Sequence, residues 1–162
     1  LEEARRVARL LIEKEPEQVS FYELLARIEI ALGNIVDALF IYEDNLELYP
    51  QDRILVRGYT DTLNKANRSR DALVTLDRFD NYQPLDPVML RIAAQAHQDL
   101  GDERSAHASL AEAYYLTGRL RRAIHQLELA LKAPSTGNFY ADAGIQARLD
   151  QLRAEESLQG PK

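Results

Sequence analysis

The chain has 162 residues, a formal net charge of −6 and no cysteine. The absence of cysteine excludes disulfides, thiolate metal ligands and a cysteine nucleophile, and the acidic balance argues against nucleic acid as a main partner. No apolar run approaches the ~18 residues that a membrane-spanning helix needs, so direct membrane insertion is not expected.

Helices are predicted throughout, because glycine and proline separate long stretches in which apolar residues recur at three- and four-residue spacing. Alternation with period two does not persist, so no sheet is expected. The nine predicted helices cover residues 1–14, 19–32, 35–48, 53–66, 69–81, 87–99, 103–117, 119–132 and 138–156. The fold class is therefore all-α.

An interval of 34 residues connects three classes of residue along the chain. The recurring residues are Ala4, Ala38, Ala72 and Ala106, then Pro16, Pro50 and Pro84, then Gly33, Asn67 and Gly101. Glycine or asparagine ends a first helix in the left-handed conformation, alanine lets two helices approach closely, and proline ends a second helix. This is the tetratricopeptide period, and the chain resembles that repeat family over nearly all of its length.

The resemblance implies one domain, a solenoid of stacked helical hairpins that we expect to be a fragment of a longer protein. Residues 1–16 are expected to be an orphan second helix. The predicted repeats are 19–52, 53–86 and 87–118, followed by an overlapping half-repeat at 103–134. The last helix, 138–156, breaks the repeat pattern and is predicted to cap the exposed end of the stack.

The overlap is predicted from Gly118 and Ala123, which repeat the Gly101 and Ala106 signal after half an interval. Residues 103–117 therefore serve as the second helix of one pair and the first helix of the next. We expect the superhelix to change direction near Gly118. The last two helices should then fold back and partly close one end of the concave groove.

Two residues depart from the repeat pattern late in the second helices. The small position there is Ala113 in one repeat but Asn45 and Phe79 in the others. Large or polar side chains at a site of close helix contact predict interfaces that are looser or re-packed.

A closer resemblance rests on the overlapping pair, the loop at 133–137, the stretch ARLDQLR and residues 71–102. These features are similar to the carboxy-terminal repeat domain of periplasmic M48-type zinc metalloproteases, the β-barrel assembly-enhancing proteases in particular. The resemblance implies a periplasmic, non-catalytic interaction domain that positions substrates or partners for the protease domain and engages outer-membrane assembly components. The catalytic His-Glu-x-x-His signature is absent, so no catalytic residue, metal ligand or cofactor is assigned to this chain.

Three other groups of residues were weighed as sites. A zinc site at His97, His107 and His125 is a minor alternative to ordinary surface histidines, because their spacing does not suit one helix face. The acidic cluster and the basic cluster are more typical of solvated faces than of a metal, acid–base or partner site. Those clusters are Glu2, Glu3, Glu13, Glu15 and Glu17, and Arg119, Arg121 and Arg122.

The concave face is the favoured site, because first helices line the groove in this fold. The candidate partner-binding residues there are Glu23, Arg27, Arg57, Asp61, Asn64, Lys65, Arg91, Gln95 and Gln98. Their cations form a basic strip suited to an extended acidic peptide or a carboxylate terminus. A hydrated groove with no dominant ligand is the alternative, and the carboxylate-clamp pattern of Asn and Lys is not reproduced.

Three functions are distinguished at this level. The first is the protease-associated interaction domain, and the second is a stand-alone tetratricopeptide scaffold of another envelope or secretion complex. The third, an enzyme, lacks any constellation of residues for chemistry. Oligomeric state stays open, because Val7, Leu10 and Leu11 form an apolar patch that another copy can cover.

Overall fold

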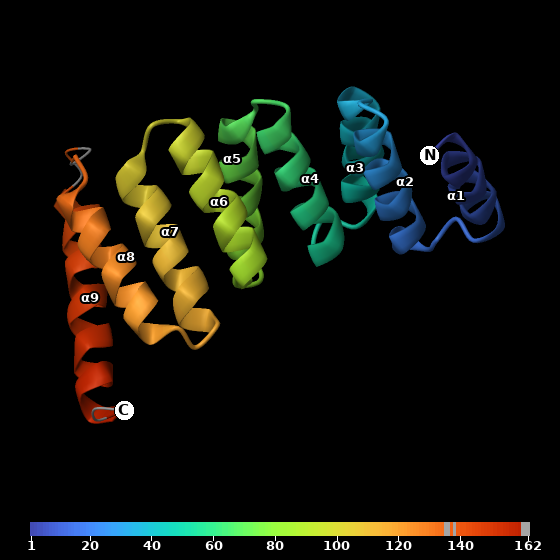
Figure 1. Ribbon diagram of the computed structural model, residues 1–162. Coiled ribbons are helices and arrows are strands. Elements are labelled where there is room, and N and C mark those ends of the chain that lie inside the picture. The colour runs from blue at the N-terminus through green and yellow to red at the C-terminus, as the bar shows by residue number, and fades with distance from the viewer. Residues whose placement is uncertain (135–136, 138, 160–162) are drawn as a thin grey trace. The chain divides into compact units, whose positions relative to one another are not determined.

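The structure is a computed structural model that describes residues 1–134, 137 and 139–159. Within these residues it contains nine α-helices and no strand (Figure 1), which confirms the predicted fold class. The helices are α1 (Glu2–Lys14), α2 (Val19–Ala31), α3 (Ile35–Leu48), α4 (Arg53–Lys65), α5 (Ser69–Asp80), α6 (Pro87–Asp99), α7 (Glu103–Leu116), α8 (Leu120–Lys132) and α9 (Phe139–Gln159).

Helix bounds differ from the predicted ones by at most three residues, the largest difference being the end of α9 at Gln159. Position 138, which the prediction placed in the last helix, lies outside the described residues. Positions 135 and 136 of the predicted loop also lie outside them, as do 160–162.

Two compact units make up the chain, Leu1–Pro84 with α1 to α5 and Leu85–Lys162 with α6 to α9. Within each unit every helix packs against the next, and in the first unit α2 also contacts α4. Figure 1 shows the hairpins of each unit as successive antiparallel pairs. The division of the chain into one domain with the stated repeat borders stays a prediction, and so does closure of a groove by the last two helices.

Four turns between helices have the same backbone geometry. Their left-handed residues are Gly33 (φ 87°), Asn67 (φ 58°), Gly101 (φ 77°) and Gly118 (φ 71°). In each turn the next residue donates its N–H to a carbonyl five residues back, at 2.9, 2.8, 2.9 and 2.9 Å for Asn34, Arg68, Asp102 and Arg119. This is the Schellman arrangement. Because the Gly118 turn matches the Gly101 turn, α7 belongs to two successive hairpins.

Aspartate caps start several helices. The Asp52 carboxylate accepts N–H bonds from Ile54 and Leu55 at 2.9 and 3.0 Å. Asp86 caps α6 in the same way, with Pro87 as the first helical residue. A short acceptor side chain before the first turn satisfies N–H groups that have no helical partner, which is why these aspartates fix where α4 and α6 begin.

The two departures from the repeat pattern are both accommodated. Asn45 is buried and donates from its side-chain amide to the Ile41 carbonyl at 2.8 Å, so its polar group is satisfied within α3. Phe79 is buried under the Arg53 guanidinium, which lies 5.3 Å from the ring centre. The contact between α5 and the start of α4 is therefore re-packed around an aromatic side chain.

Each unit has its own apolar core. In the first, α2, α3 and α4 meet at Ala26, Ala38, Tyr42 and Leu55. In the second, α7 and α8 contribute Ala111, Ala123, Ile124 and Leu127, and α9 adds Leu149 and Leu152. Since these two leucines are fully buried against the α7–α8 hairpin, α9 caps that hairpin as predicted.

Candidate functional site

The predicted groove residues of the first unit lie on two adjoining helices. Glu23 and Arg27 are on α2, and Arg57, Asp61, Asn64 and Lys65 are on α4. Because α2 contacts α4, this surface, called the α2–α4 face below, is continuous across the two first helices. Arg27 and Lys65 are exposed, and the other four are half-buried.

Tyr42 of α3 is buried in the core that α2, α3 and α4 share, next to this face. Its hydroxyl reaches the backbone of α4 at Gly58, where a Cβ atom would collide with it. Burial, reinforced by the negative charges of Glu23 and Asp61 and opposed by Arg27, raises the pKa of Tyr42. The structure therefore brings Glu23, Arg27 and Asp61 together around one phenol.

The charges of the α2–α4 face are arranged as pairs within each helix. Arg27 lies 3.7 Å from Glu23, and Lys65 donates to Asp61 at 2.6 Å, both at four-residue spacing. In the first pair the arginine side chain is 69% exposed and the glutamate only 22%. The α2 part of this face therefore presents positive charge to solvent, although the α2–α4 face as a whole carries charges of both signs.

The remaining predicted residues, Arg91, Gln95 and Gln98, are exposed on α6 in the second unit. Gln95 donates to Asp99 at 2.7 Å, one turn further along the helix. Since the six other residues lie in the first unit, a single groove across both units stays a prediction.

A pocket that the sequence analysis missed lies in the first unit between α3, α4 and α5, with a volume of about 740 Å³. We call it the α3–α5 pocket. Val56 and Tyr59 of α4 form part of its lining, about half a turn around that helix from Asp61 and Lys65. The only sequence signal for it was Phe79, which also lines it.

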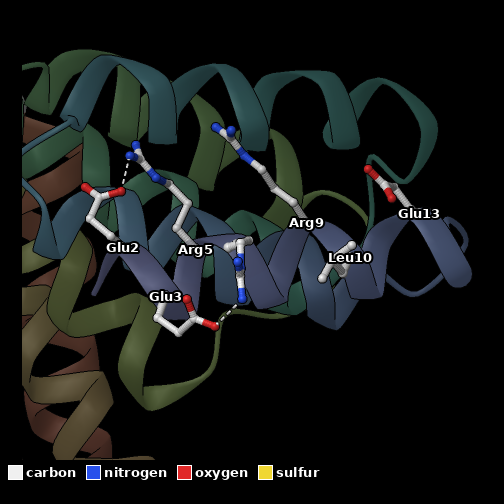
Figure 2. Close-up of a pocket in the computed structure, with 7 residues that line it drawn as sticks. Glu2, Glu3, Arg5, Arg9, Leu10 and Glu13 are labelled. Carbon is white, nitrogen blue, oxygen red and sulfur yellow. Dashed lines mark hydrogen bonds and ion pairs between the residues drawn. The ribbon is translucent and has the colours of Figure 1, made fainter.

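Along α1 a shallower pocket of about 510 Å³ is lined by charged residues and Leu10. Figure 2 shows Arg5 and Arg9 on one side of this helix and Glu3 and Leu10 on another. Arg5 and Arg9 lie 3.5 and 3.8 Å from the carboxylate of Glu29, which is only 1% exposed.

The first two carboxylates of the acidic cluster are paired with arginines of the same helix. Glu2 accepts from Arg5, and Glu3 accepts from Arg6 at 2.8 Å. Opposite charges three residues apart on a helix stabilise it weakly, so these glutamates have an ordinary role in α1.

The three histidines have separate contacts in the second unit. His97 lies 3.6 Å from Asp102, His107 hydrogen-bonds Gln126 at 2.8 Å, and His125 lies 3.9 Å from Glu128. Among the residues that the structure describes, no group of three His, Cys, Asp or Glu side chains is placed to hold a metal ion. Within the same residues, every helix is too short or too polar to cross a membrane.

The basic cluster surrounds the start of α8. The Arg121 guanidinium lies 3.1 Å from Glu156 of α9, and Arg122 lies 5.8 Å from the ring centre of Tyr114. Arg121, Arg122 and Tyr114 line a pocket of about 420 Å³ together with His125 and Gln126. Arg121 is thus partly neutralised within the unit.

Two solved structures show the same arrangement of helices. One, described as the MamA RS-1 ArsTM double mutant, is 16% identical, covers 96% of this chain and 86% of its own, and has a TM-score of 0.64. The other is TTC0263, a thermophilic TPR protein of Thermus thermophilus, also 16% identical. It covers 93% of this chain and 89% of its own, with a TM-score of 0.55.

The fold is therefore of the tetratricopeptide type, and at this identity the likeness establishes the fold alone. No protein-family model matches the chain, and no curated protein matches it either.

Proposed function

We propose that this chain is a non-catalytic domain that binds an extended segment of another protein on its α2–α4 face. The tetratricopeptide-type fold supports this proposal, because stacked helical hairpins present long surfaces to partner polypeptides. The preferred ligand is acidic, or carries a free carboxylate terminus.

The observation that carries the proposal is the unequal exposure of the Arg27–Glu23 pair. Its guanidinium faces solvent while its carboxylate is mostly covered, and the charges of both Arg27 and Asp61 act on the buried Tyr42 phenol. A guanidinium binds a carboxylate through two parallel hydrogen bonds, and a loose 3.7 Å contact leaves its donors available to a ligand.

Binding can be tested with a fluorescein-labelled decapeptide of alternating glutamate and serine, compared with its glutamine–serine counterpart. We expect the acidic peptide to bind more tightly, and the Arg27→Glu variant to lose at least about ten-fold in affinity, since it removes a charge-assisted bond and adds repulsion. The measurement is fluorescence anisotropy at two salt concentrations.

Arg70→Glu is the matched control, because Arg70 is exposed on α5 and away from the α2–α4 face. Its affinity for the acidic peptide should stay within about two-fold of the unaltered chain, as expected for a remote surface charge. Equal loss in both variants, or no loss in a folded Arg27→Glu variant, would count against the proposal.

A finer proposal concerns the biological setting. We propose that the domain positions substrates or partners for a periplasmic zinc metalloprotease in outer-membrane protein assembly and quality control. Support comes from the sequence resemblance to the repeat domains of M48-type proteases. Its partners are then the protease domain itself and outer-membrane assembly components, while zinc belongs to the protease domain. A stand-alone scaffold of another envelope complex is the competing proposal.

The reading frame upstream of Leu1 in the parent gene separates these settings. A secretory signal followed by a segment encoding His-Glu-x-x-His supports the protease setting, whereas further repeats alone support the stand-alone scaffold. The peptide experiment is independent of this outcome.

A further inference from the structure

The α3–α5 pocket has an apolar floor between two charged walls. Val56 of α4 and Phe79 of α5 are almost completely buried, and with the half-buried Leu46 they form apolar lining. Val74 of α5 and Tyr82, which follows that helix, line it as well and are more than half exposed. A concave site of this size with an apolar floor and a few polar groups is typical of a ligand site.

Hydrogen bonds fix one end of this pocket. The Tyr59 hydroxyl donates to Glu43 at 2.7 Å, and Arg68 donates to Asp71 at 2.7 Å while lying 3.8 Å from Glu43. Burial and the bond to Glu43 raise the pKa of Tyr59 to about 12, so the phenol keeps its proton. These four side chains join α3, α4 and α5, and their charges are already partnered.

Further hydrogen bonds fix the other end. Gln83 donates to the Gln51 carbonyl at 3.3 Å, which ties the residues after α5 to the loop between α3 and α4. Arg53 donates to Gln83 and to the Pro84 carbonyl at 3.3 and 3.2 Å while its guanidinium covers Phe79. The pocket is therefore formed before any ligand arrives, and binding needs little rearrangement.

Two other charged residues on the pocket walls have no such partners among the described residues. Glu47 lines the pocket from α3 and Arg78 lines it from α5, and both are exposed. In the part of the chain that the structure describes, neither side chain forms an ion pair or a hydrogen bond. One wall thus presents an unpaired anion and the other an unpaired cation, on either side of an apolar floor.

We propose that the α3–α5 pocket is a second docking site, whose occupant is a protein segment with a leucine-sized apolar side chain between a basic and an acidic residue. The apolar side chain enters between Val56 and Phe79. The basic residue then faces Glu47 and the acidic residue faces Arg78. This site is separate from the α2–α4 face and does not depend on the function proposed for that face.

The test uses four fluorescein-labelled nonapeptides that differ only in the charges flanking a central leucine: lysine–glutamate, glutamate–lysine, lysine–lysine and glutamate–glutamate. The unaltered chain should bind one of the two mixed-charge peptides most tightly, by about three- to five-fold over the like-charged ones, because rim charges contribute modestly. Replacing the leucine by alanine should weaken binding about ten-fold, since the buried apolar group is lost.

Charge reversals should change this preference in a defined way. Arg78→Glu makes both walls negative and should favour the lysine–lysine peptide, and Glu47→Lys should favour the glutamate–glutamate peptide. The double reversal should select the opposite mixed-charge peptide. Asp44→Lys and Arg70→Glu are matched controls on exposed positions of α3 and α5 outside the pocket, and they should leave the preference unchanged.

The Arg27→Glu variant separates this site from the α2–α4 face. Nonapeptide affinities that are unchanged in Arg27→Glu support the pocket, whereas a loss places the peptides on the α2–α4 face and overturns the proposal. Binding of all four peptides within about two-fold of one another overturns it too. The proposal is also overturned if folded charge-reversal variants keep the peptide preference of the unaltered chain. The same holds if the alanine peptide binds as tightly as the leucine peptide, or if no nonapeptide binds at about 1 mM.

Discussion

Helices α4 and α7 each begin a hairpin with the same turn, yet their surroundings differ. In the first unit α4 packs against α2, α3 and α5, and the space between α3 and α5 beside it is an open pocket. In the second unit the face of the α7–α8 hairpin is covered by α9, which buries Leu149 and Leu152 there. The helix that departs from the 34-residue period therefore covers apolar surface in the second unit, whereas a pocket stays accessible beside α4 in the first.

Arginine–carboxylate contacts join different helices in both units, but those that hold α9 are shorter. Arginine–carboxylate pairs connect α9 to α7 and α8, with Arg148 to Glu112 and Arg153 to Glu128 both at 2.7 Å. In the first unit Arg5 and Arg9 of α1 lie 3.5 and 3.8 Å from Glu29 of α2, and the Tyr59–Glu43 hydrogen bond connects α4 to α3. The repeat pattern positions neighbouring helices through small apolar residues, whereas α9 has no such pattern and is held by leucines together with specific ion pairs.

The largest expected effect tests the attachment of α9. Arg104 of α7 is only 7% exposed and donates to Asp142 of α9 and to the Ala133 carbonyl, both at 2.6 Å. Arg104→Ala leaves both acceptors without this donor, so it should lower the free energy of unfolding by about 3 kcal/mol, measured by urea titration.

Arg121→Ala is the control, because the Arg121 side chain is 75% exposed and its pair with Glu156 should contribute less than about 1 kcal/mol. If both variants cost the same, the buried contacts of Arg104 hold α9 no more strongly than an exposed ion pair does.

A smaller effect is expected in the first unit at Gly58. A Cβ atom there would meet the Tyr42 phenol at a distance that real Cβ atoms do not reach, so Gly58→Ala should cost about 1–3 kcal/mol of unfolding free energy through overpacking. The matched change in the second unit is Gly144→Ala, whose Cβ meets nothing within 4 Å. That variant should gain about 0.5–1 kcal/mol, because alanine favours a helix. The same sign for both would contradict the close approach of α3 and α4.

The shared turn geometry can be tested by replacing Gly118, the left-handed residue of the turn between α7 and α8. Gly118→Ala places an ordinary side chain at φ 71° and should lower the unfolding free energy by about 1–2 kcal/mol. Gly118→Asn should cost less, because Asn67 already occupies the equivalent position at φ 58° in the first unit. Thermal unfolding of both variants measures the difference. An alanine variant as stable as the asparagine variant would show that the Gly118 turn does not keep this conformation.

The smallest effect is a pH dependence in the second unit. Burial lowers the pKa of His97 below its ordinary 6.5, and the nearby Asp102 only partly opposes this. Because the folded pKa is below the unfolded one, the unfolded chain binds more protons, so stability is complete above pH about 6.5 and falls as pH falls below it. Urea titrations at pH about 7.5 and about 5.5 should show the decrease, and His97→Gln should reduce it.

Most of the fold was predictable because its signals are local. A left-handed glycine or asparagine, an aspartate cap and a proline each act within a few residues, and they placed the ends of α2 to α8 within one residue. The end of α9 was predicted less well. Residues 157–159 continue the helix past the predicted end with no glycine or proline among them to stop it.

The candidate site was predictable only in part. The period identifies which positions of α2 and α4 share a face, but the pairing of Glu23 with Arg27 was not predicted. Their unequal exposure, 22% for the glutamate and 69% for the arginine, does not appear in the sequence either. The α3–α5 pocket is less predictable still, because its size depends on the separation of two helices and on Phe79 filling a position normally occupied by a small residue.

Because the four turns have the same backbone geometry, a deletion that joins the start of one turn to the end of another should still leave an intact turn. Excising residues 35–68 joins Asn34 to Ser69, so α5 follows the Gly33 turn where α3 began and the chain loses one complete hairpin. In the second unit the excision can be half as long, because removing 102–118 joins Gly101 to Arg119 and makes α8 the direct partner of α6. A repeat protein that uses the same turn in successive hairpins can therefore gain or lose single helices.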